Sequence, residues 1–242
     1  MKYYLDQIAI EVTRKCNMNC AHCLRGDAQN VNIDNSYIDK LLEDVSGIGN
    51  VTFTGGEPSL NVDAIEYTLN KCIEMNIPVG SFYVVTNAKA NPLPLAIACL
   101  KWYAYCDYRD DGVCGISISH DMFHDDIDRE HEAILRGLAF FREDKTTDFN
   151  KTRLINEGRA ANLYHMDKVS QSYRHEEFTY EEWGDEETRI ESMIYLSANG
   201  EVRTDCDIAY DNYEYTIGNL QNRTLKSMID EQIVEQLDCL PC

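Results

Sequence analysis

Hydrophobic and polar positions alternate between two periods along the first two thirds of the chain. Apolar residues at positions 5, 8, 10 and 12 predict a strand over 4–12, and short apolar runs predict strands at 51–53, 81–86 and 115–119. Between these runs, apolar residues at helical spacing predict helices starting at 35 (with Gly47 as the stop), over 64–73, over 92–105 and over 131–142. A fifth strand is expected at 152–155. This alternation predicts right-handed βαβ units around a parallel sheet.

The pattern changes beyond about residue 161. The run 176–187 is strongly acidic and is typical of a solvated loop or helix face; its position also suggests a lid. Asn199-Gly200, between apolar runs at 193–197 and 201–203, predicts a β-hairpin, because both turn residues tolerate positive φ. Thr224 is expected to cap a final helix. We therefore predict a core over 1–160 and a C-terminal α+β extension over 161–242.

Length and composition suit one large domain, or a domain with an appendage: 242 residues with 44% hydrophobic content. No apolar run approaches the ~20 residues of a membrane span, and the N-terminus lacks a signal-peptide layout, so a cytoplasmic protein without membrane contact is expected. The net charge of −20 argues against a nucleic-acid partner. It would attract a basic peptide, although solubility is the simpler explanation of the charge.

Three cysteines with the spacing C-x3-C-x2-C follow the first predicted strand: Cys16, Cys20 and Cys23. In a reducing compartment, cysteines are metal ligands or buried thiols rather than disulfides. Three gathered thiolates suit zinc, copper(I) or an iron–sulfur cluster. Structural zinc takes four closed ligands, whereas a [4Fe–4S] cluster bound by three cysteines keeps one iron open for a ligand that is not protein. The spacing alone leaves zinc as an alternative.

A second motif, Thr54-Gly55-Gly56-Glu57-Pro58, follows the second predicted strand. Its glycines permit a sharp turn and a close approach of the backbone to a ligand, and the carboxylate of Glu57 can receive an ammonium group. Alone, the motif could be an ordinary strand–helix turn. Together and in this order, the two motifs resemble the signature of the radical S-adenosylmethionine (radical SAM) superfamily, with the resemblance covering roughly residues 8–160.

That resemblance implies an α/β fold, a partial (β/α)6 TIM-type barrel with its chemistry at the C-terminal ends of the strands. It implies that the three cysteines hold a catalytic [4Fe–4S] cluster, whose open iron binds SAM. His22 stands where the family usually has an aromatic residue packed by the adenine. The remaining candidate SAM-binding residues are Gly55, Gly56, Glu57, Pro58, Thr86, Asn87, Ser117, Ser119, Asp121 and Arg159.

The family's reaction would be reductive cleavage of SAM to a 5′-deoxyadenosyl radical that abstracts hydrogen from a substrate, with electrons from a flavodoxin- or ferredoxin-like donor. The C-terminal part resembles the SPASM or twitch extensions, whose owners often modify peptides, so a peptide or protein side chain is the expected substrate. The alternatives are a small molecule such as a nucleotide or cofactor precursor, a glycyl-radical activase, and a non-catalytic zinc-binding module.

The other cysteines and two histidines are less informative. Cys206, Cys239 and Cys242 could hold an auxiliary cluster, be a degenerate remnant or be free thiols, and no cysteine lies shortly before the hairpin as SPASM domains would have it. Cys72 and Cys99 lie on apolar helix faces and are expected in the core. His120 and His124, around Asp121 and Phe123, could form a metal site. With no helix predicted there, we expect them instead to be loop residues, one of which could touch substrate. No role follows for Cys106 and Cys114.

Overall fold

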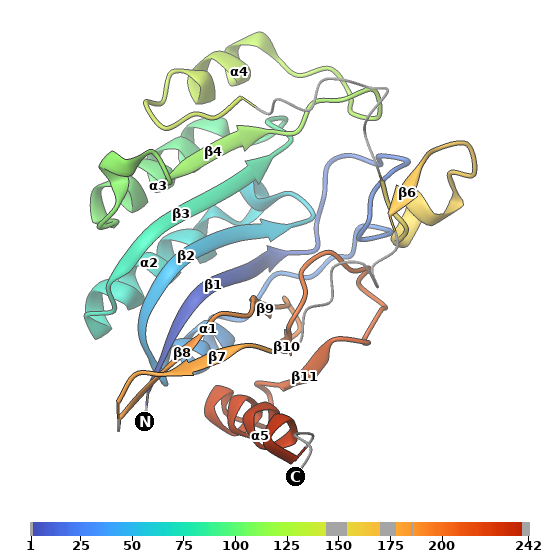
Figure 1. The fold of residues 1–242 in the computed structure, drawn as a ribbon. Helices are drawn as coiled ribbons and strands as arrows, with labels where there is room; N and C mark the ends of the chain where they lie inside the picture. The colour runs from blue at the N-terminus through green and yellow to red at the C-terminus, as the bar shows by residue number, and fades with distance from the viewer. Residues whose placement is uncertain (1, 144–153, 170–177, 185, 239–242) are drawn as a thin grey trace.

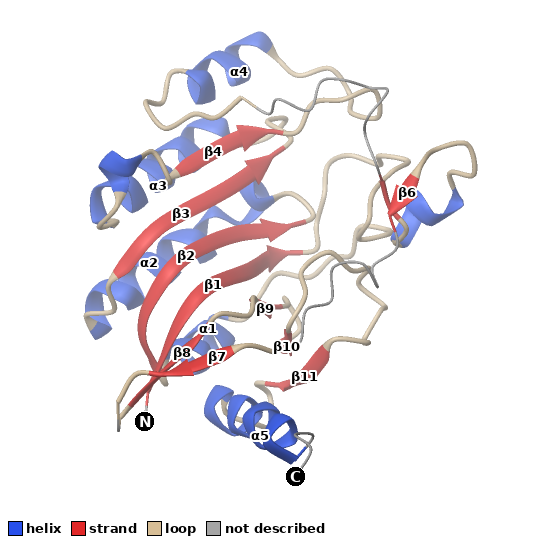
Figure 2. Cartoon of the chain, viewed as in Figure 1, coloured by secondary structure: helices blue, strands red, loops and turns tan. Residues whose placement is uncertain are grey.

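The parallel sheet predicted from the sequence is present. The computed structural model describes residues 2–143, 154–169, 178–184 and 186–238 (Figure 1). Four strands pair in parallel in chain order: β1 (Lys2–Thr13), β2 (Val45–Gly55), β3 (Val79–Thr86) and β4 (Gly115–Ile118). Three helices connect them: α1 (Asn35–Leu42), α2 (Val62–Met75) and α3 (Pro92–Tyr105). They cover one face of the sheet (Figure 2), which confirms the mixed α/β fold class.

The core lies between this sheet and its helices. Leu5, Ile8 and Ile10 of β1 have no exposed surface. Phe53 of β2 packs against Trp102 of α3, with ring centroids 5.2 Å apart. Removing a large apolar side chain from water contributes about 1.5–3 kcal/mol. The consecutive buried positions at the C-terminal end of β1 therefore fix this strand as the centre of the sheet, which holds the loop that follows it.

Two predicted helix boundaries differ from the structure. The first helix ends at Leu42 rather than near Gly47, because β2 already begins at Val45, where it pairs with Tyr3 of β1. The helix after β4 is α4 (Arg129–Arg136), which is shorter than the predicted 131–142. The side chain of Asp128 caps α4 by accepting a hydrogen bond from the backbone of Glu130 at 2.8 Å. The helix ends at its C-cap, Gly137, whose backbone N–H donates to the Ala133 carbonyl at 3.1 Å.

The fifth predicted strand does not lie beside β4. It is β5 (Leu154–Ile155), which pairs with β6 (Lys168–Val169) in a separate two-stranded sheet. A short 3-10 helix (Gly158–Asn162) follows β5. Within the described residues, the series of parallel strands that begins at β1 thus ends at β4, whose outer edge forms an isolated parallel bridge between Ile116 and Phe141.

The C-terminal region extends the same sheet from the other edge of β1. There, β9 (Ile194–Leu196) runs parallel to β1 and forms an antiparallel hairpin with β10 (Glu201–Arg203), which confirms the hairpin predicted at Asn199-Gly200. Strand β11 (Thr216–Asn219) follows, and then α5 (Leu225–Asp238). Ser227 donates its backbone N–H to the Thr224 hydroxyl at 3.1 Å, which confirms the predicted cap.

The acidic segment lies far from the predicted cofactor loop. Its described part forms the hairpin of β7 (Tyr180–Glu182) with β8 (Glu187–Ile190), and β8 pairs with residues 2–5, at the start of β1. The cysteine loop follows the opposite end of β1 (Figure 1). This placement argues against a lid function for the described part of the segment. No helix in the described ranges has the length and apolar character needed to cross a membrane.

Candidate functional site

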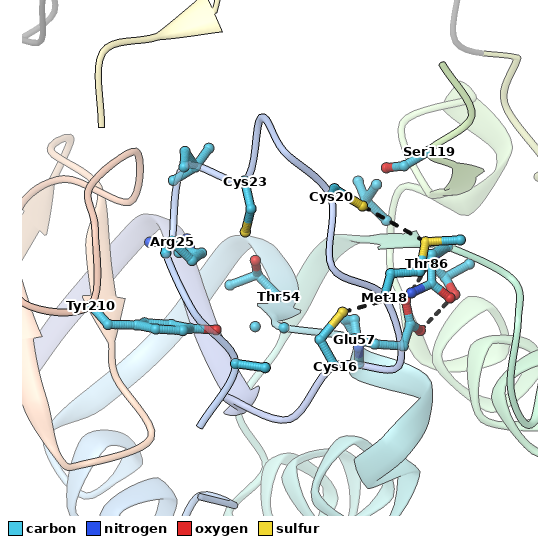
Figure 3. Close-up of a pocket in the computed structure, with 18 of the residues that line it drawn as sticks. Cys16, Met18, Cys20, Cys23, Arg25, Thr54, Glu57, Thr86, Ser119 and Tyr210 are labelled. Carbon is cyan, nitrogen blue, oxygen red and sulfur yellow. Dashed lines mark hydrogen bonds between the residues drawn. The ribbon is translucent and has the colours of Figure 1, made fainter. Parts of the chain in front are cut away.

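A cavity of about 420 Å³ lies at the C-terminal ends of β1, β2 and β3. Its walls combine the two sequence motifs: Cys16, Cys20 and Cys23 from the loop after β1 line it together with the turn after β2 (Figure 3). The carboxyl ends of parallel strands are where α/β enzymes of barrel type place their chemistry. The structure therefore brings together the residues that the sequence singled out first.

The three thiols are not gathered as closely as a single zinc ion requires. Zinc–sulfur bonds of ~2.3 Å in a tetrahedron place sulfur atoms roughly 4 Å apart. In the part of the chain that the structure describes, one group of three His, Cys, Asp or Glu ligands has all its atoms within 4.8 Å, and it contains none of these cysteines. A cubane binds each thiolate on a different corner, so wider spacing fits it. Burial raises the pKa of Cys16 and Cys20, so cluster binding must displace their protons.

The diglycine turn is packed directly on the cysteine loop. Gly55 has a φ of +147°, and a Cβ at Gly55 or Gly56 would collide with the carbonyl oxygen of Thr13 or of Lys15. The backbone N–H of Gly56 donates to the Thr13 carbonyl at 2.9 Å, and that of Glu57 donates to the Lys15 carbonyl at 2.8 Å. Glycine is therefore required for the turn to approach the loop this closely.

The Glu57 carboxylate is buried and held by three donors. One oxygen, Oε1, accepts from the backbone of Ser59 at 2.9 Å and from the Thr86 hydroxyl at 2.7 Å; Oε2 accepts from the backbone of Asn87 at 2.7 Å. A carboxylate offers about four acceptor positions, so one remains on Oε2. Within the described residues, no Lys, Arg or His side chain forms an ion pair with Glu57. The carboxylate is thus oriented and keeps one acceptor position for a cationic donor.

The candidate residues after β3 and β4 divide into two groups. Thr86, Asn87 and Ser119 line the cavity, as does Pro58 of the diglycine turn. Ser117 does not line it, because its hydroxyl lies 2.7 Å from the Tyr83 hydroxyl within the sheet. Ser117 lies within β4, whereas Ser119 follows the end of the strand, where the cavity lies.

Asp121 also stands outside the cavity lining and contacts two histidines instead. Its carboxylate accepts a hydrogen bond from Nδ1 of His124 at 2.7 Å and lies 3.4 Å from Nε2 of His22. The His22 ring lines the cavity and stacks on Phe123, with centroids 4.7 Å apart and planes 25° apart. Burial lowers the pKa of His22. Asp121 thus holds His22 in place, and His120 lies outside both the cavity lining and this cluster.

Arg159 reaches the cavity from the 3-10 helix after β5. Its backbone N–H donates to the Cys23 carbonyl at 2.9 Å, and its guanidinium contacts the side chains of Asn19 and, at 3.2 Å, Asp27. The Nε atom of Arg159 is buried without a hydrogen-bond partner among the described residues. This short segment therefore carries a cation to the rim of the cysteine loop.

The structure adds residues that the sequence did not indicate. Arg25, two positions after Cys23, and Tyr210, from the region after β10, both line the cavity. The position of Arg25 beside the cysteine motif could have indicated it, whereas no feature of the sequence indicated Tyr210. Cys206 also lines the cavity, and burial raises its pKa to about 11. Cys239 and Cys242 lie outside the described residues.

The remaining cysteines belong to the core. Cys72 and Cys99 are fully buried, which confirms the prediction, and burial raises the pKa of each to about 12. Cys106 and Cys114, for which no role is predicted from the sequence, are buried with them in the same hydrophobic cluster. These four thiols therefore explain part of the high cysteine content without any metal.

Fold and site together define an α/β protein of the open-barrel class with a three-cysteine site at its strand ends. A family model described as the radical SAM superfamily matches residues 10–147, more than half of the chain. The chain belongs to the radical SAM superfamily. Membership implies SAM and a [4Fe–4S] cluster as cofactors, and the spread of the three thiols and the open acceptor position on Glu57 fit both.

Known proteins resemble the chain over different lengths. A GTP 3′,8-cyclase from Chlorobaculum tepidum is 39% identical over 61 residues, which is 24% of this chain and 18% of the cyclase. The chain matches a quarter or less of the length of the curated relatives compared with it. These alignments therefore cover part of the core rather than a whole related enzyme.

Two solved structures share the fold across nearly all of the chain. A structure of BtrN in complex with AdoMet and 2-DOIA has a TM-score of 0.57 and 14% identity, covering 99% of this chain and 88% of BtrN. A structure of native anSMEcpe with bound AdoMet and Cp18Cys peptide has a TM-score of 0.50 and 11% identity, covering 96% and 82% of the two chains. At such low identity these likenesses establish the fold alone.

Proposed function

We propose that this protein is a radical SAM enzyme that reductively cleaves SAM at a [4Fe–4S] cluster. The observation that carries the proposal is that Cys16, Cys20 and Cys23 share one cavity with the oriented carboxylate of Glu57. When bound, the reduced cluster and SAM supply a 5′-deoxyadenosyl radical that abstracts hydrogen from the substrate.

The chain's own residues bind and orient the cofactors. The three thiolates hold the cluster, and the free acceptor position of Glu57 receives the ammonium group of SAM. The guanidinium of Arg159 pairs with the carboxylate of SAM in a charge-assisted contact. His22, held by Asp121, packs by the adenine. The rest of the SAM site is formed by three residues that line the cavity, Thr86, Asn87 and Ser119.

Anaerobic reconstitution tests this proposal. We expect a brown protein with absorbance near 400 nm, bound iron and sulfide, and 5′-deoxyadenosine formation once a reductant and SAM are added. Cys20→Ala should lose the cluster, whereas Cys72→Ala, which removes a buried thiol from the core, should retain it. A colourless protein with stoichiometric zinc would instead identify the zinc-binding module.

For the substrate, we propose a peptide or protein side chain. The charge of −20 favours association with a basic peptide, and anSMEcpe, whose structure holds a peptide, shares the fold. A small molecule is the second candidate, because the core resembles GTP 3′,8-cyclase and a cavity of about 420 Å³ has the size of a small-molecule site. Basic peptides and GTP should be compared for their ability to raise 5′-deoxyadenosine formation above the substrate-free rate.

We also propose that residues 161–242 act as a SPASM- or twitch-like extension of the core 1–160, with electrons supplied by a flavodoxin- or ferredoxin-like donor. Cys206 supports this, because it brings a thiol of the extension to the cavity wall. The iron content of a variant with Cys206, Cys239 and Cys242 all replaced by Ala tests for an auxiliary cluster. Loss of about half of the iron would establish one, and unchanged iron would leave a single cluster.

A further inference from the structure

The hydroxyl group of Tyr210 is buried and has no hydrogen-bond partner among the described residues. The residue is 4% exposed, and its Oη atom is shielded from solvent. A buried polar group that forms no hydrogen bond costs about 1–3 kcal/mol, and such groups are rare in native proteins. The hydroxyl therefore calls for a partner that is not part of the polypeptide.

Two hydrogen bonds hold the segment that contains Tyr210 against the cysteine loop. Its backbone N–H donates to the Arg25 carbonyl at 3.1 Å, and the Arg25 guanidinium donates to the Ile208 carbonyl at 2.9 Å. Arg25 is only two residues from Cys23. A segment almost two hundred residues away in sequence is thus fixed to the end of the loop that supplies the three thiols.

The side chain of Tyr210 has a defined direction. The guanidinium of Arg14 lies over its ring at 4.6 Å from the centroid, and Arg203 donates to the carbonyls of Ala209 and Tyr210 at 3.3 and 3.4 Å. Figure 3 shows the hydroxyl pointing toward the space between Cys16 and Cys23. Ring and backbone are therefore both anchored, and the hydroxyl faces the place where a cluster would lie.

We propose that Tyr210 donates a hydrogen bond to the [4Fe–4S] cluster, to a cluster sulfide or to the Cys23 thiolate, and thereby raises the reduction potential of the cluster. This inference rests on the proposed function, since it needs a cluster in the cavity. Hydrogen bonds to sulfur are among the factors that set the potential of iron–sulfur clusters. A donor stabilises the reduced form more than the oxidised form, because the reduced cluster carries one more negative charge.

Two properties of Tyr210 suit it to this role. Burial raises the pKa of its phenol far above the ordinary value, so the hydroxyl keeps its proton and remains a donor. Secondly, Tyr210 belongs to the C-terminal extension, in the region after β10, so the extension rather than the cysteine loop supplies this hydrogen bond to the cluster. The C-terminal extension would therefore help to set the potential of the cluster as well as shape the cavity.

The test compares Tyr210→Phe with Tyr105→Phe in the reconstituted full-length protein. Tyr105 is a matched control, because its hydroxyl donates to the Ile77 carbonyl at 2.7 Å and lies outside the cavity lining. In a redox titration followed by electron paramagnetic resonance, we expect a more negative midpoint potential for Tyr210→Phe and the wild-type value for Tyr105→Phe. After exchange into D2O, pulsed spectra of the reduced cluster should lose one deuteron coupling in Tyr210→Phe alone.

A second variant at position 210 tests the proposal if Tyr210→Phe does not fold. Replacement of Tyr210 by 3,5-difluorotyrosine retains the hydroxyl but makes it a stronger donor, so the midpoint potential should become more positive than that of the wild type. Unchanged potentials and unchanged deuteron couplings in iron-loaded Tyr210 variants would overturn this inference. Wild-type protein that binds no iron after reconstitution would instead overturn the proposed function on which it rests.

Discussion

Replacing Glu57 by Gln separates the structural role of this carboxylate from its binding role. In the native chain its two oxygens accept three hydrogen bonds, from Ser59, Thr86 and Asn87. The amide oxygen of Gln can keep the two donors that meet Oε1, but its NH2 group would then face the Asn87 N–H. Leaving that donor unsatisfied costs about 1–3 kcal/mol, and two charge-assisted bonds become neutral.

Relief of the buried charge offsets part of this loss, so we expect Glu57→Gln to lower the unfolding free energy of the cofactor-free chain by about 3 kcal/mol. For a chain of 242 residues, this corresponds to a fall in Tm of about 6–12 °C. SAM affinity should fall further than stability explains, because the amide also lacks the charge that pairs with an ammonium group. The assays are thermal denaturation and equilibrium binding of SAM to the reconstituted protein.

The matched control is Glu66→Gln, on α2. Glu66 is partly exposed and pairs with Lys101 at 2.6 Å, and an exposed ion pair of this kind contributes at most about 1 kcal/mol. If Glu57→Gln melts with the control and binds SAM as the wild type does, both the hydrogen-bond account of the turn and the assigned ammonium site are wrong.

Two further changes probe local structure. Asp34 caps α1 by accepting from the backbone of Ser36 at 2.8 Å, and hydrogen bonds from the Ser36 side chain and backbone lower the pKa of Asp34. Asp34→Ala should therefore lower stability by about 0.5–1 kcal/mol at pH 7. This difference should begin to shrink as the pH falls below the ordinary pKa of about 4 and should vanish only below the lowered pKa of the native carboxylate; a constant difference in acid melts would contradict this account. Gly200 has a φ of +81°, and an added Cβ would lie 2.7 Å from the Tyr37 ring. Gly200→Ala should therefore lower the free energy of unfolding by about 1–3 kcal/mol, measured by denaturant unfolding. An unchanged denaturant midpoint would refute this strain.

The sequence by itself determined the local elements and the two motifs. Helix α3 begins at Pro92 and ends at Tyr105 as the apolar spacing predicts, and the cysteine loop and the diglycine turn follow the strands that the pattern placed before them. These features depend on residues close together in the chain, where periodicity, turn chemistry and motif spacing act directly. Even the proximity of the two motifs follows from the parallel order of neighbouring strands.

Tertiary structure alone decided which distant groups complete the cavity. Nothing in the local pattern pairs β9 with β1, and that pairing is what brings Tyr210 to the loop carrying Cys23. Likewise, Ser119 follows the end of β4 and lines the cavity, whereas Ser117 lies within the strand and is bonded to Tyr83. Contacts of this kind arise from long-range burial and hydrogen bonding between segments far apart in sequence. No short window of residues contains that information.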